Sequence, residues 1–183
     1  MSEEMLSFDA YIEQGSMGRH ETFAPRYGWL KKGYDAVKED GTVFNAGDAV
    51  VRLGVGKNMV RSIRFWCTAF HLIESSPENN SYMVATKLGD KLLDDNGWDP
   101  YLEDIASIWL LHWHLFVPQL EAASWSIVFN NCNDPSFDNN QLSEILLTAA
   151  TKYARFASIS KNTIKRDASC LIRMYYEENQ KKG

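Results

Sequence analysis

The sequence of 183 residues contains little cysteine and no long apolar run. Its three cysteines, Cys67, Cys132 and Cys170, are far apart and form no Cys-x-x-Cys pair. This argues against a disulfide framework and a thiolate zinc site, and it is typical of a cytoplasmic protein. No apolar run approaches the ~18 residues of a transmembrane helix, and the acidic start is the reverse of a signal peptide. We therefore expect a cytoplasmic protein without a membrane partner.

Recognisable motifs for cofactors and metals are also missing. The stretch from Gly54 to Lys57 is far shorter than a nucleotide-binding loop. His112 and His114 are two residues apart on an expected helix, so they point in nearly opposite directions and cannot share one metal ion. The acidic run between Asp94 and Asp104 fits either a divalent cation or solvated charges at a helix start. We predict no metal site and no cofactor in the chain.

Aromatic residues, by contrast, are abundant. The sequence has six Trp, eight Tyr and nine Phe, with 45% hydrophobic and 23% charged residues. Such a composition excludes disorder for most of the chain and is typical of a globular protein. The length is sufficient for one large domain or two small ones, each with its own core.

Charge is unevenly distributed along the chain. The net charge is −5, but residues 19–64 hold nine bases against five acids, and residues 158–183 hold six against three. Residues 65–157 between them hold four bases and twelve acids. A nucleic-acid-binding protein needs a basic face rather than a basic total, because phosphate contacts are local. Two basic segments around an acidic middle are compatible with such faces, or with a merely solvated surface.

Hydrophobic periodicity predicts a mostly α fold with two winged-helix or helix-turn-helix-like units around a buried central helix, and with short β-hairpins. The central helix is expected over 102–116, because Asp99 and Pro100 form a good helix start and the segment is apolar nearly all round. The expected divisions are a polar lead-in with little structure at 1–18, a first winged-helix-like unit at 19–98, the buried helix with a second helix-turn-helix-like unit at 99–178, and a tail at 179–183.

The expected local elements follow the apolar spacing and the turn residues. A strand is expected at 82–85, followed at 86–94 by a small helix or half of a wing. Further helices are expected at 28–39, 47–53, 57–74, 122–129, 142–153 and 160–176.

The first helix-turn-helix candidate covers residues 47–74. Gly54 and Gly56 predict a tight turn. The helix that follows has an apolar side, Met59, Ile63, Trp66, Phe70 and Ile73, and a polar side with basic residues at the same helical steps. A recognition helix places such a side in the major groove and reads bases with its N-terminal residues. We predict DNA contacts by Lys57, Asn58, Arg61 and Arg64.

The second candidate covers residues 142–176. An amphipathic helix and a short link precede a helix for which Ser160 is the expected N-cap. The inward positions of this helix are Ile164, Ala168, Leu171 and Tyr175. Basic side chains near a helix N-terminus favour phosphate binding. We predict DNA contacts by Lys161, Asn162, Lys165 and Arg166, although a solvated amphipathic helix is the alternative for each candidate.

The segment 18–33 is the densest polar and aromatic stretch. His20 and Glu21 are candidate base and acid for phosphodiester hydrolysis, with Arg19 and Arg26 on the phosphate. The alternative is an irregular segment that packs its aromatic residues and solvates the rest. A divalent metal, Mg²⁺ or Mn²⁺, is expected only if the chain nicks DNA.

Several strings together resemble one bacterial family. They are GRHETFAPRYGWLKKG (18–33), LGVGKNMVRSIRFW (53–66), GWDPYLED (97–104), WLLHWHLF (109–116) and S-x-NTIKRD (160–167). The resemblance is to the SspB-like family, long labelled a domain of unknown function, and it runs in unbroken order over roughly residues 17–178. That family belongs to the Ssp system of DNA phosphorothioation and anti-phage defence.

The resemblance implies DNA as a partner, DNA nicking as an activity, and work alongside ATPase and sulfurtransferase components. Family members continue into a further C-terminal region, so this chain is similar to their N-terminal portion. If the nicking centre lies in that further region, the chain is expected only to bind DNA. The alternatives are a transcription regulator without catalysis and a protein-interaction module for the sulfur-transfer partners.

Overall fold

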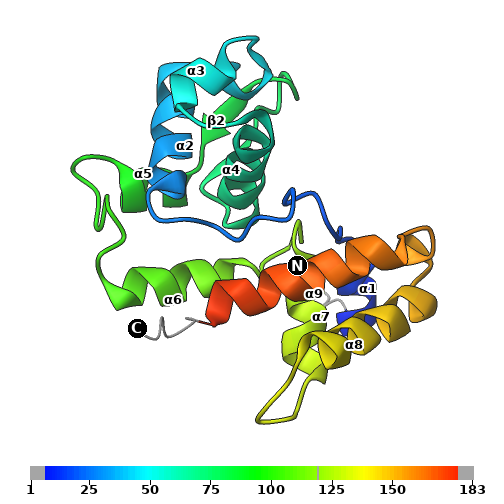
Figure 1. Ribbon diagram of the computed structural model, residues 1–183. Helices are drawn as coiled ribbons and strands as arrows, with labels where there is room; N and C mark the ends of the chain where they lie inside the picture. Colours follow the sequence, from blue (N-terminus) through cyan, green and yellow to red (C-terminus); the bar gives the residue numbers. More distant parts are fainter. Residues whose placement is uncertain (1–6, 119, 177–183) are drawn as a thin grey trace, which may run out of the picture. The chain divides into compact units, whose positions relative to one another are not determined.

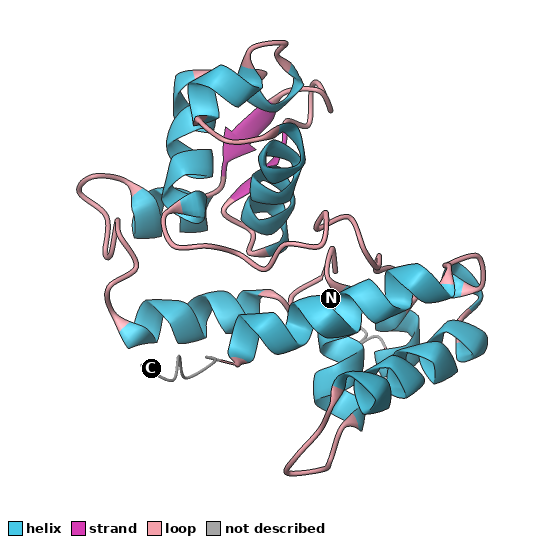
Figure 2. Ribbon diagram, in the orientation of Figure 1, coloured by secondary structure: helices cyan, strands magenta, loops and turns pink. Residues whose placement is uncertain are grey.

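The computed structural model describes residues 7–118 and 120–176. These residues are mostly helical, with one two-stranded antiparallel sheet among them (Figure 1, Figure 2). The chain forms two compact units: a central unit at 19–117 and a terminal unit made of 1–18 and 118–183. Within the described ranges, no helix combines the length and apolar character needed to cross a lipid bilayer.

Close helix packing forms the core of the central unit. Helix α2 (Trp29–Glu39) contacts α4 (Lys57–Ala69), and α3 (Ala49–Leu53) lies beside both (Figure 1). Gly33 allows the close approach, because a Cβ there would lie 2.5 Å from Cys67 Sγ and 2.8 Å from Ile63 Cγ2. Trp66 of α4 is fully buried, and its indole N–H donates to the Phe23 carbonyl at 2.9 Å. The predicted helices at 28–39, 47–53 and 57–74 are present, with shifted ends.

A β-hairpin follows α4, where a longer helix was predicted. Strand β1 (Ile73–Ser75) pairs antiparallel with β2 (Met83–Ala85), and Ile73 faces Ala85 (Figure 2). Helix α4 ends at Ala69 because His71 adopts a φ of 56° and turns the chain. The apolar Ile73, which fits the helical spacing, is therefore a buried strand residue. The predicted strand at 82–85 is confirmed.

Helix α5 (Lys87–Leu93) begins after Thr86, whose hydroxyl accepts the Gly89 N–H at 3.0 Å. The small helix was one of the two alternatives for 86–94. The next helix, α6 (Ile105–His114), begins later than predicted. The Asp99 carboxylate accepts backbone N–H groups of Glu103 and Asp104, both at 2.9 Å, so it closes a turn instead of starting the helix.

Helix α6 is not the buried centre of the fold, which corrects the prediction for 102–116. Only Ser107 and Leu111 are buried within it, whereas most of its large apolar side chains are exposed. A helix that is apolar on all sides is expected to be buried in a core. The same composition is also found in helices whose apolar side contacts another protein. Helix α6 belongs by its contacts to the central unit, whereas the predicted boundary at 98/99 placed it with the C-terminal helices.

The terminal unit combines both ends of the chain. Helix α1 (Phe8–Ile12) contacts α7 (Ala123–Asn131), and Ile12 is fully buried. The Ser16 N–H donates to the Leu120 carbonyl at 2.8 Å and fixes the chain beside α7. The expectation of little structure at 1–18 is therefore wrong for the described residues 7–18, because a few apolar residues in that polar segment pack into the core.

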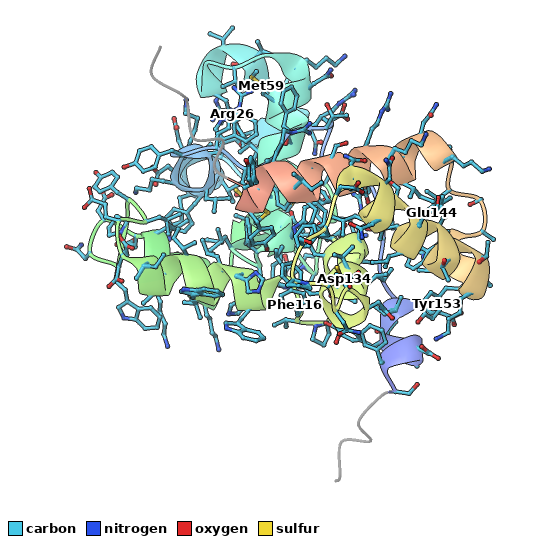
Figure 3. All side chains as sticks on the ribbon, turned by 60° about the horizontal axis from the view of Figure 1, so that its bottom comes forward. Arg26, Met59, Phe116, Asp134, Glu144 and Tyr153 are labelled. Carbon is cyan, nitrogen blue, oxygen red and sulfur yellow. The ribbon has the colours of Figure 1, made fainter. Side chains whose placement is uncertain are left out.

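Two long helices complete the terminal unit. Helix α8 (Asn139–Lys152) begins with a capping box in which Asp138 and Gln141 exchange hydrogen bonds with the backbone. The 3₁₀ turn η2 (Ala154–Phe156) leads to α9 (Lys161–Tyr175), and Ser160 is its N-cap as predicted. Figure 3 shows Tyr153 beside α1, where its hydroxyl donates to the Asp9 carboxylate at 2.7 Å. The predicted tail at 179–183 lies outside the described residues.

Candidate nucleic-acid interface

The first basic face lies at the start of α4. Gly54 ends α3 with a left-handed φ of 62°, and Gly56 is the N-cap of α4. Because Gly56 has no side chain to cap the helix, the first N–H groups of α4 lack a side-chain acceptor there. Lys57 and Asn58 are exposed on this first turn. A helix start with a partial positive charge and a lysine is suited to a phosphate.

The two arginines of α4 have different surroundings. The exposed Arg61 lies 3.5 Å from the Glu21 carboxylate, a loose ion pair at the surface. Arg64 is half-buried, and its guanidinium donates to the Asn45 side-chain oxygen at 3.3 Å and to Met83 sulfur at 3.6 Å. Arg61 therefore has a surface position suited to a ligand, whereas Arg64 also holds the hairpin against the turn η1 (Val43–Asn45).

Residues 19–26 form an irregular segment that packs beside α4. Arg19, Glu21 and Thr22 have positive φ angles of 69°, 50° and 66°. His20 is only 2% exposed, and its ring contacts Phe65 and Trp66 at centroid distances of 5.9 and 6.3 Å. This burial favours packing over catalysis for His20, because a base must reach its substrate.

The charged residues close to His20 in the sequence are more exposed than its ring. Glu21 is partly exposed and is placed against Arg61, and Arg19 is exposed. The guanidinium carbon of Arg26, Cζ, lies 5.3 Å from the ring centroids of both Phe23 and Trp29. Figure 3 labels Arg26 in the central unit. Cation–π contacts of this kind orient a guanidinium while leaving its N–H edge available.

The second basic face lies on α9. Its four predicted DNA-contacting residues, Lys161, Asn162, Lys165 and Arg166, are all exposed. The opposite face packs through Ile164, Ala168 and Leu171, which are buried as predicted, whereas Tyr175 is 42% exposed and contacts Phe129 at 5.2 Å. The Ser160 hydroxyl accepts the Thr163 N–H at 3.1 Å and fixes the first turn. Helical spacing was sufficient to predict this face.

One residue of this helix was not singled out by the sequence analysis. Asp167 is 1% exposed, and its carboxylate accepts the Gly18 N–H at 3.0 Å and the Ser124 hydroxyl. It thereby joins α9 to α7 and to the N-terminal segment. The only signal was an acidic residue beside an apolar stripe, and its partners are far away in the sequence. The buried Asp167 carboxylate therefore holds in place the helix that carries the basic face.

The remaining candidates for chemistry have structural partners. The rings of His71 and His114 lie 6.0 Å apart, while His112 contacts Trp109 and Phe116. Burial lowers the pKa values of His112 and His114. Across 7–118 and 120–176, no three His, Cys, Asp or Glu side chains are grouped to hold a metal ion.

Comparisons with known proteins connect this geometry to a family. A comparison with curated proteins gave no match. Among solved structures, the chain is similar to an SspB crystal structure with a TM-score of 0.81 and 36% sequence identity, over 90% of this chain and 52% of that one. A magnesium ion-bound SspB crystal structure matches with the same TM-score and identity, over 90% of this chain and 51% of that one.

The chain thus spans about half the length of the SspB chains that it matches. The SspB-like resemblance of the sequence strings is confirmed by these structures. The family model described as "Protein of unknown function (DUF4007)" matches residues 17–183. Because that match covers nearly the whole sequence, the chain belongs to the DUF4007 family and is SspB-like in sequence and fold.

Proposed function

We propose that this chain binds DNA as the winged-helix-like part of an SspB-like nicking component in bacterial DNA phosphorothioation and anti-phage defence. The observation that carries the proposal is the exposure of two basic helix faces, on α4 and on α9. Each face lies on a helix that follows another helix, as a recognition helix does. The connection from α3 to α4 is the short segment 54–56, and the connection from α8 to α9 is the longer segment 153–160 with the turn η2. The SspB similarity supports the same assignment.

The central unit supports the finer winged-helix assignment. Its order is α2, α3, α4 and then the hairpin of β1 and β2. In this arrangement α4 is the recognition helix and the loop 76–82 is the wing tip. Arg64 connects the two parts through Met83. A DNA major groove that receives α4 would meet Lys57, Asn58 and Arg61 first.

Salt dependence of DNA binding tests the first face. Arg61→Ala removes one exposed cation, so the slope of log K against log[salt] is expected to fall by about 0.9. Lys87→Ala, an exposed lysine at the start of α5, is the matched control and leaves the slope unchanged. Adding Arg64→Ala lowers affinity further. A folded Arg61→Ala, Arg64→Ala double variant with wild-type affinity would remove α4 from the interface.

Nicking is the second part of the proposal and needs its own assay. Supercoiled plasmid is incubated with the chain and Mg²⁺ or Mn²⁺, and a gel shift is run alongside. Glu21→Gln tests a surface group, and His20→Ala tests the buried ring. Nicking that is lost in Glu21→Gln, with binding retained, assigns the chemistry to residues 19–26. Binding without nicking assigns this chain to DNA docking alone.

We further propose that the ATPase and sulfurtransferase components contact the acidic surface. Asp94, Asp95 and Glu103 lie at or near the surface between α5 and α6. Their substitution by Ala is expected to weaken partner binding and to leave DNA binding intact. A transcription regulator would differ in two respects: it would bind a defined operator, and it would not nick. Selection of bound sequences from a random DNA library separates the two hypotheses.

A further inference from the structure

Helix α6 carries an exposed apolar stripe that the DNA-binding proposal does not use. The exposed members are Ile105, Ile108, Trp109 and Trp113, with fractions of 68%, 46%, 57% and 65%. His112 and Phe116 complete the stripe, because the six positions fall at steps of three, one, three, one and three. That spacing covers one side of an α-helix. Figure 3 shows ring-bearing side chains standing out from one side of α6.

The stripe is distinct from the side of α6 that is buried. Ser107, Leu111 and Leu115 are buried and recur at steps of four. Trp109 and Trp113 contact His112 and Phe116 edge-on, at centroid distances of 5.5 and 6.1 Å, so the rings form one continuous surface. The helix thus has two apolar sides, of which the aromatic one is exposed to solvent.

The exposed apolar area of the stripe follows from these exposed fractions. Tryptophan side chains bury ~150–250 Å² each, so the exposed fractions of these two leave roughly 200–300 Å² of aromatic surface. With the two isoleucines the stripe reaches roughly 400–500 Å², the size of the largest apolar patch on a typical monomeric protein, and such patches are often functional. Such a surface costs free energy in water, and a matching apolar surface would remove that cost.

We infer that this stripe is a homodimer interface, in which α6 pairs antiparallel with α6 of a second copy of the chain. A self-complementary pair doubles the contact to roughly 800–1,000 Å², within the range of weak and transient interfaces. The dimer is therefore expected to dissociate in the micromolar range. This inference is independent of the proposed DNA binding, since it uses none of the residues assigned to DNA.

Charge selects the antiparallel direction. Glu103 and Asp104 lie at the N-terminal end of α6, and residues 99–117 contain no Lys or Arg. In a parallel pair these carboxylates would lie together and repel, whereas the antiparallel pair separates them by the length of α6. Helix dipoles favour the same direction. Ile105 then faces Phe116 of the second copy, and Trp109 lies near the two-fold axis.

Sedimentation equilibrium of the full chain over the micromolar range tests the pairing. Wild type is expected to dimerise, and a Trp109→Ala, Trp113→Ala variant is expected to stay monomeric with at least a tenfold weaker association. Trp98→Ala is the matched control, because Trp98 is 66% exposed but lies outside the stripe. A wild type that remains monomeric throughout overturns the inference, as does a stripe variant that dimerises like wild type.

Disulfide trapping tests the direction of the helices. Ile105→Cys and Phe116→Cys chains are prepared separately, each with Cys132→Ser, and are then mixed under oxidising conditions. The antiparallel pair predicts a crosslink between the two different variants and none within either alone. A crosslink within Ile105→Cys alone shows a parallel pair and refutes the antiparallel arrangement. Circular dichroism of each variant checks that the helices are intact.

Discussion

Asp167 supports the α9 face, and its substitution gives a sharp test of how the terminal unit is held together. In Asp167→Ala, the Gly18 N–H and the Ser124 hydroxyl both lose a buried acceptor. An unsatisfied buried group costs about 1–3 kcal/mol, and hydrogen bonds to a charged group lie at the strong end of the range. We therefore expect a loss of about 3–5 kcal/mol, a large part of a typical domain's ~5–15 kcal/mol.

Graded variants separate the hydrogen bonds from the bulk of the side chain. Asp167→Asn retains the shape and one acceptor, so it is expected to cost about 1–2 kcal/mol, and Ser124→Ala about 1 kcal/mol. Asp134→Ala is the matched control, because Asp134 is an exposed aspartate in the same unit, labelled in Figure 3. Exposed substitutions of this kind usually change stability by less than ~0.5 kcal/mol.

Urea unfolding followed by circular dichroism measures these changes, and hydrogen exchange at the Gly18 amide reports the bond itself. The Gly18 amide is expected to be protected in wild type and to exchange faster in Asp167→Ala. Weaker DNA binding by the α9 face is also expected in the destabilised variant. If Asp167→Ala unfolds at the wild-type urea concentration with Gly18 still protected, the role of Asp167 has been misassigned.

Three further outcomes are expected. Gly33→Ala should lower stability by about 1–3 kcal/mol in thermal unfolding although alanine favours helices, because the added methyl group would overlap Cys67. Burial raises the pKa of the Cys67 thiol, so it should resist a thiol reagent in the folded protein while the partly exposed Cys132 reacts first; equal rates would contradict this. The Arg52 guanidinium, together with two hydrogen bonds from Thr42, lowers the pKa of Asp40 to about 2 from 3.8. The stability advantage of wild type over Arg52→Ala should therefore be full above pH 4 and disappear as pH falls towards 2, which urea unfolding at several pH values measures.

The faces of the two basic helices were predictable because they depend on local spacing. Lys57, Arg61, Lys161 and Arg166 are exposed as the helical period requires. The N-cap of α9 was predictable for a similar reason, since Ser160 acts on the turn directly after it. Local signals of this kind need no knowledge of the tertiary structure.

The predictions from sequence failed where one sequence pattern is compatible with two different structures. The apolar character of 102–116 fits a core helix and an interface helix equally, and only the structure shows that Trp109 and Trp113 are exposed. Ile73 continues a helical stripe, but the turn at His71 assigns it to a strand. The role of Asp167 depends on partners 149 and 43 residues away, which no local pattern reports.

The central claim, that two basic faces bind DNA, is tested most directly by salt titrations of DNA affinity. The measurement compares wild type, Arg61→Ala, and a Lys161→Ala, Lys165→Ala, Arg166→Ala variant on one duplex. Our account predicts that the slope of log K against log[salt] falls by about 0.9 for the single substitution and by about 2.7 for the triple one. Wild-type slopes in both folded variants would contradict it.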